Sequence, residues 1–196
     1  LVTKSVTQLI EKYFDKFDPD VAITNMENGP NWPRPEYTWK DVPLTREQIK
    51  KKWDDIGTYA RNRGTWLHYN IESHLNGDEV EGFKDAVLLE EMKQFHSFEK
   101  NVLIPNEITP YRTEWVIGSK ELDIAGTVDF VGKLPNGTFV LMDWKRSLKL
   151  PKNLVNTWKN AKSPISHLQD CEGVKYSLQL NLYKYILRNV YGLDVQ

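Results

Sequence analysis

Cysteine is nearly absent from this sequence, since Cys171 is the only one among 196 residues. A single cysteine excludes an internal disulfide, a four-cysteine zinc site and a cysteine-ligated iron–sulfur cluster. It favours a reducing, intracellular setting without indicating a compartment. Long apolar runs are absent as well. There is no stretch of 18 apolar residues and no visible secretory signal, so we expect neither a membrane span nor a membrane partner.

An excess of charge of one sign is also lacking, because 26 lysines and arginines face 27 aspartates and glutamates and leave a net charge of −1. The charges are unevenly distributed. Residues 144–196 carry nine basic and three acidic side chains, which gives this segment +6 and the rest of the chain −7. A basic segment beside acidic residues suits a phosphate backbone, although any single lysine is more often only a solubilising group.

Length and composition predict one domain over residues 1–196, with a helical part over 1–104 and a sheet-bearing part over 105–196. A composition of 40% hydrophobic and 27% charged residues is that of an ordinary globular protein with a full core. The chain begins at Leu1 without a methionine, and its last helical pattern ends almost at Gln196. We therefore expect either a domain excised from a larger protein, with partner domains outside this chain, or a chain trimmed at its ends.

Periodicity predicts the order of the helices and strands, and that order defines the fold class. Apolar spacing predicts helices over 5–17, 45–76, 83–103 and 172–191. Runs of β-branched and aromatic residues predict strands over about 107–117, 121–133 and 138–146. Residues 18–44, with a proline- and tryptophan-rich stretch at 24–44, predict an ordered loop. The expected fold is α/β, with a mixed central β-sheet flanked by helices and an N-terminal helical extension.

The longest helix has recognisable ends. Thr45 followed by Gln48 is a capping-box pattern at its start, and Gly77 is a C-cap after its end. Gly57 and Gly64 lie inside it and are candidate break points, because glycine is unfavourable in a helix interior.

Two aspartates occupy core-like positions in the stretch 126–145, GTVDFVGKLPNGTFVLMDWK. The sequence predicts two strands around a turn at Pro135-Asn136-Gly137. With a three-residue turn, Asp129 lies directly opposite Asp143, and Lys145 shares their face. Opposed buried carboxylates are costly unless a cation meets them, which here is either a metal ion or the nearby Lys145. Oxygen ligands are those that Mg²⁺ and Mn²⁺ prefer. The hairpin therefore predicts a divalent metal site.

The turn length decides whether this site exists. A two-residue turn at Asn136-Gly137 would pair Asp129 with Trp144 and separate the two aspartates. The preceding strand adds Glu114, which either two-residue turn near residue 119 places on the face of Asp129. The same turns place Asp123 on that face, so Asp123 is a rival ligand.

Two helices add polar pairs with a spacing of four residues, which puts each pair on one face. His68 and Glu72 form the first pair, and His68 is a candidate fourth metal ligand, although a lone helical histidine is more often packed or solvated. Gln179 and Tyr183 form the second pair, at the edge of an apolar stripe where they can reach a backbone or a phosphate. Three further histidines show no partner pattern, and we expect structural roles for them: His74, His96 and His167.

In this order, these motifs resemble those of PD-(D/E)XK nucleases of the RecB-type branch. The resemblance covers roughly residues 1–190 and rests on GTWLH at 64–68, Glu114, GTVD at 126–129, DWK at 143–145 and Gln179-x-x-x-Tyr183. The segment Ser5-Val6-Thr7 is similar to the opening of mitochondrial genome maintenance exonucleases and of phage-type nucleases. The family implies a restriction-endonuclease-like core with the order α-β-β-β-α.

The resemblance also implies an activity: a metal-dependent exonuclease acting on single-stranded DNA in replication, repair or recombination, with associated domains of those processes as partners. The implied ligands of one or two Mg²⁺ or Mn²⁺ ions are His68, Glu114, Asp129, Asp143 and the carbonyl of Trp144. Lys145 would orient or deprotonate the attacking water. The implied substrate contacts are Gln179, Tyr183, Arg146 and Ser5. The cysteine quartet of the iron–sulfur members is absent.

Two other functions stay open at this point. Cap-snatching RNA endonucleases also combine a histidine, two or three acids and a lysine on a similar sheet, but the GTVD and QxxxY motifs argue against that activity. A nucleic-acid-binding module on an inactive nuclease fold would normally have lost an acid or the lysine, and all are present. Trp32, Trp39 and Trp158, in expected loops, are candidates for stacking on unpaired bases.

Overall fold

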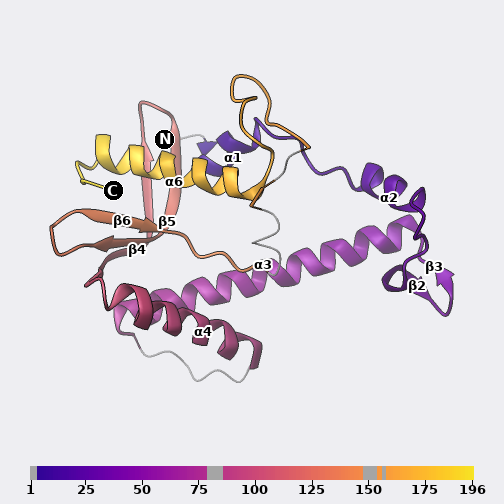
Figure 1. Ribbon diagram of the computed structural model, residues 1–196, viewed down its shortest axis with the longest axis horizontal. Coiled ribbons are helices and arrows are strands. Elements are labelled where there is room, and N and C mark those ends of the chain that lie inside the picture. Colours follow the sequence, from indigo (N-terminus) through magenta and orange to yellow (C-terminus); the bar gives the residue numbers. More distant parts are fainter. Residues whose placement is uncertain (1–3, 79–85, 148–153, 156–157) are drawn as a thin grey trace. The chain divides into compact units, whose positions relative to one another are not determined.

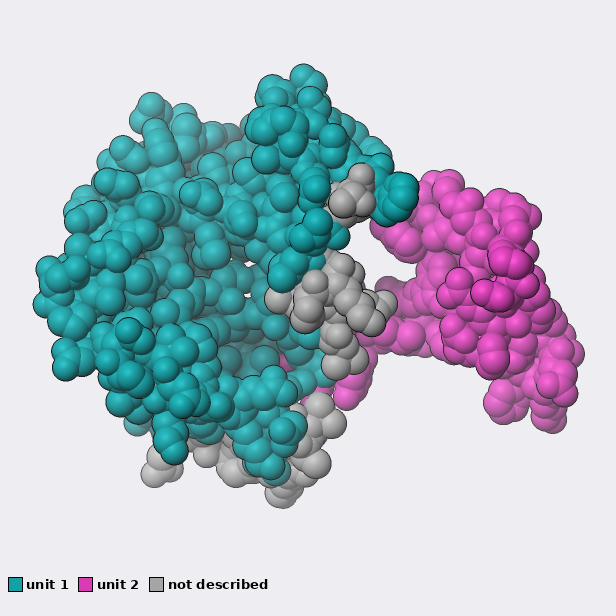
Figure 2. All heavy atoms as spheres, viewed as in Figure 1, with its two compact units in different colours: residues 1–15, 64–196 teal, residues 16–63 magenta. Residues whose placement is uncertain are grey.

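The computed structural model describes residues 4–78, 86–147, 154–155 and 158–196 (Figure 1). By its internal contacts the chain divides into two compact units, one of residues 1–15 with 64–196 and one of residues 16–63 (Figure 2). Helix α3 (Arg46–Asn76) contributes to both units. The expected boundary at residue 104 separates helical from sheet-bearing sequence. The two units are instead defined by which residues contact one another, and they do not divide at residue 104.

The smaller unit is more regular than expected. Residues 18–44 were expected to be a loop, but helix α2 (Pro19–Glu27) forms there. Asp18 accepts hydrogen bonds from the amides of residues 20 and 21 at 2.9 and 3.2 Å, and a proline at the first helical position completes a favourable helix start. A 3-10 turn, η1 (Pro35–Tyr37), and the short strands β2 (Thr38–Trp39) and β3 (Val42–Pro43) follow.

Helix α3 is continuous over its 31 residues, so neither candidate glycine breaks it. The expected capping box is confirmed: the Thr45 amide donates to Gln48 Oε1 at 2.8 Å, and the Gln48 amide donates to Thr45 Oγ1 at 3.3 Å. Gly77 has a φ of +75°, as a C-cap requires. Arg46, in the first turn, anchors α3 to α2 through Glu27 Oε2 at 2.5 Å.

The larger unit contains a mixed sheet flanked by helices, which confirms the expected fold class at that level. Its central strand, β5 (Ile124–Lys133), pairs antiparallel with β4 (Thr109–Ser119) along one edge. The other edge is shared. There β5 pairs in parallel with β1 (Lys4–Ser5) at its start and antiparallel with β6 (Phe139–Met142) at its end. Between these two partners, residues 126–129 have no strand neighbour on that edge within the described chain.

The β5–β6 hairpin has the expected register. Phe130 pairs with Met142 and Lys133 with Phe139, as a three-residue turn requires. The Leu134 amide donates to the carbonyl of residue 138 at 2.9 Å across that turn. Strand β6 is shorter than expected, however, because the ladder stops at residue 142 rather than 146. The expected ladder pair of Asp129 and Asp143 is therefore not formed, and the Asp129 side chain instead accepts a hydrogen bond from the Trp144 amide.

The β4–β5 turn differs from both expected forms. Ser119 pairs with Ile124, so four residues, 120–123, form the turn in place of two. Four residues preserve the parity of the register, and Glu114 still falls level with Asp129. Asp123 lies in the turn itself with a φ of +54° and is 3.9 Å from Lys4. It belongs to the far end of the strand and not to the candidate ligand set.

The larger unit contains further helices. Helix α1 (Val6–Glu11) is shorter than the expected 5–17. Helix α4 (Ala86–Phe98) continues into a π-helical turn, η2 (Glu99–Leu103), and the expected start at residue 83 lies outside the described residues. Helix α6 (Glu172–Asn189) closes the chain. None of the described helices is both long and apolar enough to cross a membrane.

Two apolar clusters hold the larger unit together. The first joins α1, β4, β5 and α6, with Val6, Val128 and Ile186 fully or almost fully buried. The second joins α3 to α4 and receives the indole of Trp144. Segments from both sides of the sheet thus meet at the end of β6, beside the acidic residues that the sequence singled out.

Two glycine substitutions should have opposite effects on stability. A methyl group at Gly126 would lie 2.6 Å from Cε1 of Tyr183, whereas one at Gly64 would meet no atom within 4 Å. We expect Gly126→Ala to lower the free energy of unfolding by about 1–3 kcal/mol through overpacking. Gly64→Ala, its matched control, should raise it by about 0.5–1 kcal/mol through helix propensity. Urea denaturation measures both, and equal effects would contradict the proposed Gly126–Tyr183 packing.

Candidate metal and catalytic site

An irregularity in the sheet positions the first two acids. The ladder between β4 and β5 is regular on either side but forms no regular pair between Glu114 and Asp129. Glu114 has a φ of +43°, a conformation that costs a non-glycine residue roughly 1–3 kcal/mol. Local departures of this kind re-aim side chains and are common beside active sites.

The side chains of β5 show the same change of direction. Val128 and Val131 both belong to the core cluster with α6. Between them, Asp129 approaches His68 of α3, and Phe130 contacts the indole of Trp144. Two consecutive side chains therefore point away from α6, which strict alternation along a strand does not allow.

Helix α3 brings His68 to both acids. Its Nδ1 lies 3.0 Å from Glu114 Oε1 and 3.7 Å from Asp129 Oδ2. Its Nε2 lies 3.0 Å from the carbonyl oxygen of Trp144. When Nε2 carries the proton, it donates to that carbonyl and leaves Nδ1 unprotonated toward the two acids.

These three side chains fit a divalent metal ion. One ligand atom from each of His68, Glu114 and Asp129 lies within 4.8 Å of the other two. A histidine whose second nitrogen donates to a backbone carbonyl is the usual arrangement around a bound metal, because the hydrogen bond fixes the tautomer. Two carboxylates supply the oxygen ligands that Mg²⁺ and Mn²⁺ prefer. The structure thus joins three of the expected ligands.

The fourth expected side-chain ligand, Asp143, lies outside that group and pairs with the expected lysine. Its Oδ2 is 2.5 Å from Lys145 Nζ, and only 6% of its side chain is exposed. Its other oxygen, Oδ1, is buried and has no hydrogen-bond partner in the described part of the chain. An unsatisfied buried carboxylate oxygen is costly, and a cation would satisfy it.

The segment that links these groups is fixed from both sides. The Trp144 amide donates to Asp129 Oδ2 at 2.7 Å, which takes the place of the expected Asp129–Asp143 ladder pair. The indole packs against three aromatic rings at centroid distances of 5.5–5.8 Å: Phe95, Phe98 and Phe130. Trp144 therefore anchors the chain and sets the positions of the residues on either side of it.

The pKa values of several side chains in the cluster are shifted in the directions that their burial and close spacing predict. Burial raises the pKa of Asp129 to about 6, and the nearby charge of Asp143 adds to this effect. The hydrogen bond to Glu114 raises the pKa of His68, and the charge of Asp129 adds to it. Burial also raises the pKa of Glu72, with a further contribution from Glu114. Negative charge is concentrated here beyond what His68 and Lys145 can balance.

The metal-free protein should lose stability at this cluster as the pH rises from about 4 to above 6.5. Folding raises both pKa values from ordinary values of 3.8 for Asp129 and 6.5 for His68. The folded state then binds these protons more tightly than the unfolded chain. Their stabilising effect is complete below the ordinary pKa values and is lost as the pH rises through the folded ones.

Thermal unfolding in a chelator measures this pH dependence. The difference in Tm between the wild type and Asp129→Asn isolates the aspartate from other titrating groups. Asp129→Asn should become the more stable of the two as the pH rises. Added Mn²⁺ should stabilise the wild type more at higher pH, because metal ligands must be deprotonated. A Tm difference that is constant across the pH range would contradict the assignment.

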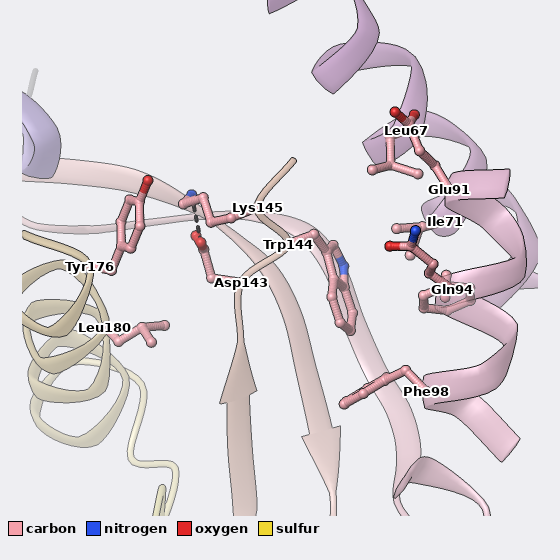
Figure 3. Close-up of a pocket in the computed structure, with 11 residues that line it drawn as sticks. Leu67, Ile71, Glu91, Gln94, Phe98, Asp143, Trp144, Lys145, Tyr176 and Leu180 are labelled. Carbon is pink, nitrogen blue, oxygen red and sulfur yellow. Dashed lines mark ion pairs between the residues drawn. The ribbon is translucent and has the colours of Figure 1, made fainter. Parts of the chain in front are cut away.

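A pocket of ≈ 460 Å³ adjoins the aspartate–lysine pair (Figure 3). Apolar residues of α3, α4 and α6 line most of it, among them Ile71, Phe98 and Leu180. In Figure 3, Lys145 and Asp143 lie on the side of the pocket nearer to α6, and the indole of Trp144 extends toward Phe98. The Lys145 ammonium is 5.2 Å from the ring centroid of Tyr176. This ring is a contact that the sequence did not indicate.

The four expected substrate contacts are all engaged within the protein. Tyr183 is 3% exposed, packs against Gly126 and accepts a hydrogen bond from Gln179 Nε2 at 3.1 Å. Burial raises its pKa. Ser5 caps helix α1, where its Oγ accepts from the amide of residue 8 at 3.0 Å. Arg146 pairs with Glu91 Oε1 at 2.5 Å. In this structure each of these four side chains therefore has a partner within the protein.

Comparisons with protein-family models, with curated proteins and with solved structures gave no match for this chain. Any activity assigned to it must therefore come from its own residues and their geometry.

Proposed function

We propose that this protein is a metal-dependent nuclease of the PD-(D/E)XK type that hydrolyses phosphodiester bonds in DNA. The proposal rests mainly on one observation. Three metal-capable side chains, His68, Glu114 and Asp129, converge at an interrupted sheet edge, immediately beside a buried Asp143–Lys145 pair with an unsatisfied oxygen. Ion pairs with a purely structural role would not require more carboxylates than cations at this site.

A restriction-endonuclease-like core is part of the same proposal. The supporting feature is the antiparallel run β4–β5–β6, preceded by α4 with η2 and followed by α6, which matches the order α-β-β-β-α. In that arrangement the candidate residues come from β4, from β5, from the end of β6 and from helix α3.

The residues divide into ligands and a charge-bearing group. One or two Mg²⁺ or Mn²⁺ ions would be held by His68, Glu114, Asp129 and Asp143, and when bound would polarise the scissile phosphate and lower the pKa of a coordinated water. Lys145 supplies a positive charge fixed by Asp143, which can orient the attacking water and stabilise the charge that develops on the phosphate. The Trp144 carbonyl holds the His68 tautomer.

Exposed aromatic side chains support a single strand as the preferred substrate. On α3, Trp66 and Tyr69 flank His68 in sequence and are 58% and 59% exposed. Their ring centroids are 6.2 Å apart at 89°. Trp158 is 94% exposed. Unpaired bases stack on such rings, whereas duplex DNA keeps its bases covered. Trp32 packs against Tyr37 in the smaller unit and is a weaker candidate than expected.

A matched set of substrates tests the activity. End-labelled single-stranded DNA, duplex DNA and single-stranded RNA of one sequence are incubated with the protein and Mn²⁺, each with open and with blocked ends. We expect cleavage of single-stranded DNA with open ends, with progressive shortening. Preferential cleavage of RNA would favour the endonuclease alternative. Binding of any strand without cleavage, with either Mg²⁺ or Mn²⁺, would favour an inactive binding module and contradict the proposal.

A further inference from the structure

A second group of metal-capable side chains lies outside the candidate catalytic site. His74 lies near the end of α3, His96 near the end of α4, and Glu99 is the first residue of the π-helical turn η2. One ligand atom from each of the three lies within 4.8 Å of the other two. The sequence gave no partner for His74, because its contact, Glu99, lies 25 positions away. His96 contacts the same Glu99, three residues further on, a pair that the sequence did not single out.

The distances within this group are close to those around a tetrahedral ion. His74 Nε2 lies 2.9 and 3.0 Å from the two oxygens of Glu99, and His96 Nδ1 lies 3.4 Å from one of them. Ligands about 2.0–2.2 Å from a tetrahedral zinc ion are about 3.3–3.6 Å apart. Adjustments of a few tenths of an ångström would bring both contacts to Glu99 to this spacing. The ligand nitrogens of the two histidines lie within 4.8 Å of each other and would close around the ion as it binds.

The ligand types select the class of ion. Two imidazoles and one carboxylate suit Zn²⁺ and related first-row ions, whereas Mg²⁺ and Ca²⁺ prefer oxygen ligands alone. Three protein ligands leave a fourth position for water. The side chains of His74, His96 and Glu99 are 32%, 47% and 26% exposed, so an ion could enter from solvent.

The surroundings hold the two histidines in place. The ring of Phe95, which is 5% exposed, lies 5.7 Å from His74 and 5.8 Å from His96. The two imidazole centroids are 4.7 Å apart, with their planes at 74°. Glu99 begins a π-helical turn. Such turns are rare in proteins, and those that occur are often found at functional sites. A buried aromatic ring and a helix irregularity thus shape the group.

We propose that His74, His96 and Glu99 bind Zn²⁺ as a structural clip between the ends of α3 and α4. The clip would close the chain between residues 74 and 96 and fix the helix that presents His68, about 9 Å away along α3. It would also steady Phe95, whose ring lies 5.5 Å from the indole of Trp144. This role is separate from cleavage and does not depend on the proposed nuclease activity.

The test uses the full chain after chelator treatment and dialysis. Asp129→Asn serves as the background, because it disables the first group and leaves the clip intact. Titration with ZnCl₂ by calorimetry should show one tight equivalent, and Co²⁺ should give the visible absorption bands of a tetrahedral site. Zn²⁺ at about 100 times its Kd should raise the Tm by about 5–10 °C.

Three variants decide the outcome. In the same background, His96→Gln and Glu99→Gln should weaken Zn²⁺ binding at least tenfold and abolish the Co²⁺ bands, whereas His167→Gln, a histidine outside the group, should change neither. His96 is the most exposed of the three, so its variant should stay folded, which circular dichroism checks. Absence of tight binding in the background protein, or equal binding in all variants, would overturn the clip. Either result would leave the nuclease proposal standing.

Discussion

Asp129→Asn should abolish cleavage, by at least about 10³-fold, while the protein stays folded. Asparagine keeps the shape of the side chain and can still accept the hydrogen bond from the Trp144 amide. It removes the charge on which a metal ligand depends. Burial and Asp143 raise the pKa of Asp129 to about 6, so removal of that charge should raise the Tm of the metal-free protein near neutral pH.

Three measurements on one preparation check this result: the cleavage rate with Mn²⁺, the Mn²⁺ affinity by calorimetry, and the Tm in a chelator. The matched control is Asp123→Asn, an acid of the same sheet that lies in the β4–β5 turn. It should leave all three quantities near those of the wild type. Unchanged Mn²⁺ affinity in Asp129→Asn would contradict the ligand assignment, even if cleavage were lost.

Lys145→Met should reduce kcat by about 10²–10⁴-fold and leave the Mn²⁺ affinity nearly unchanged. The side chain supplies positive charge beside Asp143 and is not itself a metal ligand. Its removal leaves a buried carboxylate without its ion-pair partner, which should lower the free energy of unfolding of the metal-free protein by about 1–3 kcal/mol. Bound metal should restore part of that loss.

Lys133→Met is the matched control, since Lys133 is an exposed lysine at the end of β5, the strand that pairs with β6. It should change neither kcat nor stability appreciably. A Lys145→Met protein that cleaves at the wild-type rate would remove the lysine from the mechanism. A loss of Mn²⁺ affinity equal to that of Asp129→Asn would show that the lysine acts only by ordering the site.

Features set by neighbouring residues could be predicted from the sequence. The turn at Pro135-Asn136-Gly137 fixes the hairpin register through local backbone chemistry, and the register placed Asp129 and Asp143 at one level. The capping box at the start of α3 is equally local. Helix α2 was missed although its signal was present, because the proline-rich stretch after it outweighed the helix start at Asp18.

Features set by distant contacts could not be predicted in this way. The positive φ of Glu114 depends on how two strands meet, and no residue near it in sequence indicates it. The sequence indicates no ion-pair partner for Arg146, but in the structure it pairs with Glu91, 55 residues earlier. The sequence singled out both Gly126 and Tyr183, and only the fold shows that the ring occupies the space that a side chain at Gly126 would need.

The most direct test of the metal-dependent nuclease is one cleavage reaction run in parallel on the wild type and Asp129→Asn. Both proteins are purified identically and incubated with end-labelled single-stranded DNA, with Mn²⁺ or with a chelator. The predicted result is cleavage by the wild type with Mn²⁺, and none by the wild type in chelator or by Asp129→Asn in either condition. Equal cleavage by the two proteins, or no cleavage by the wild type with either Mn²⁺ or Mg²⁺, would contradict it.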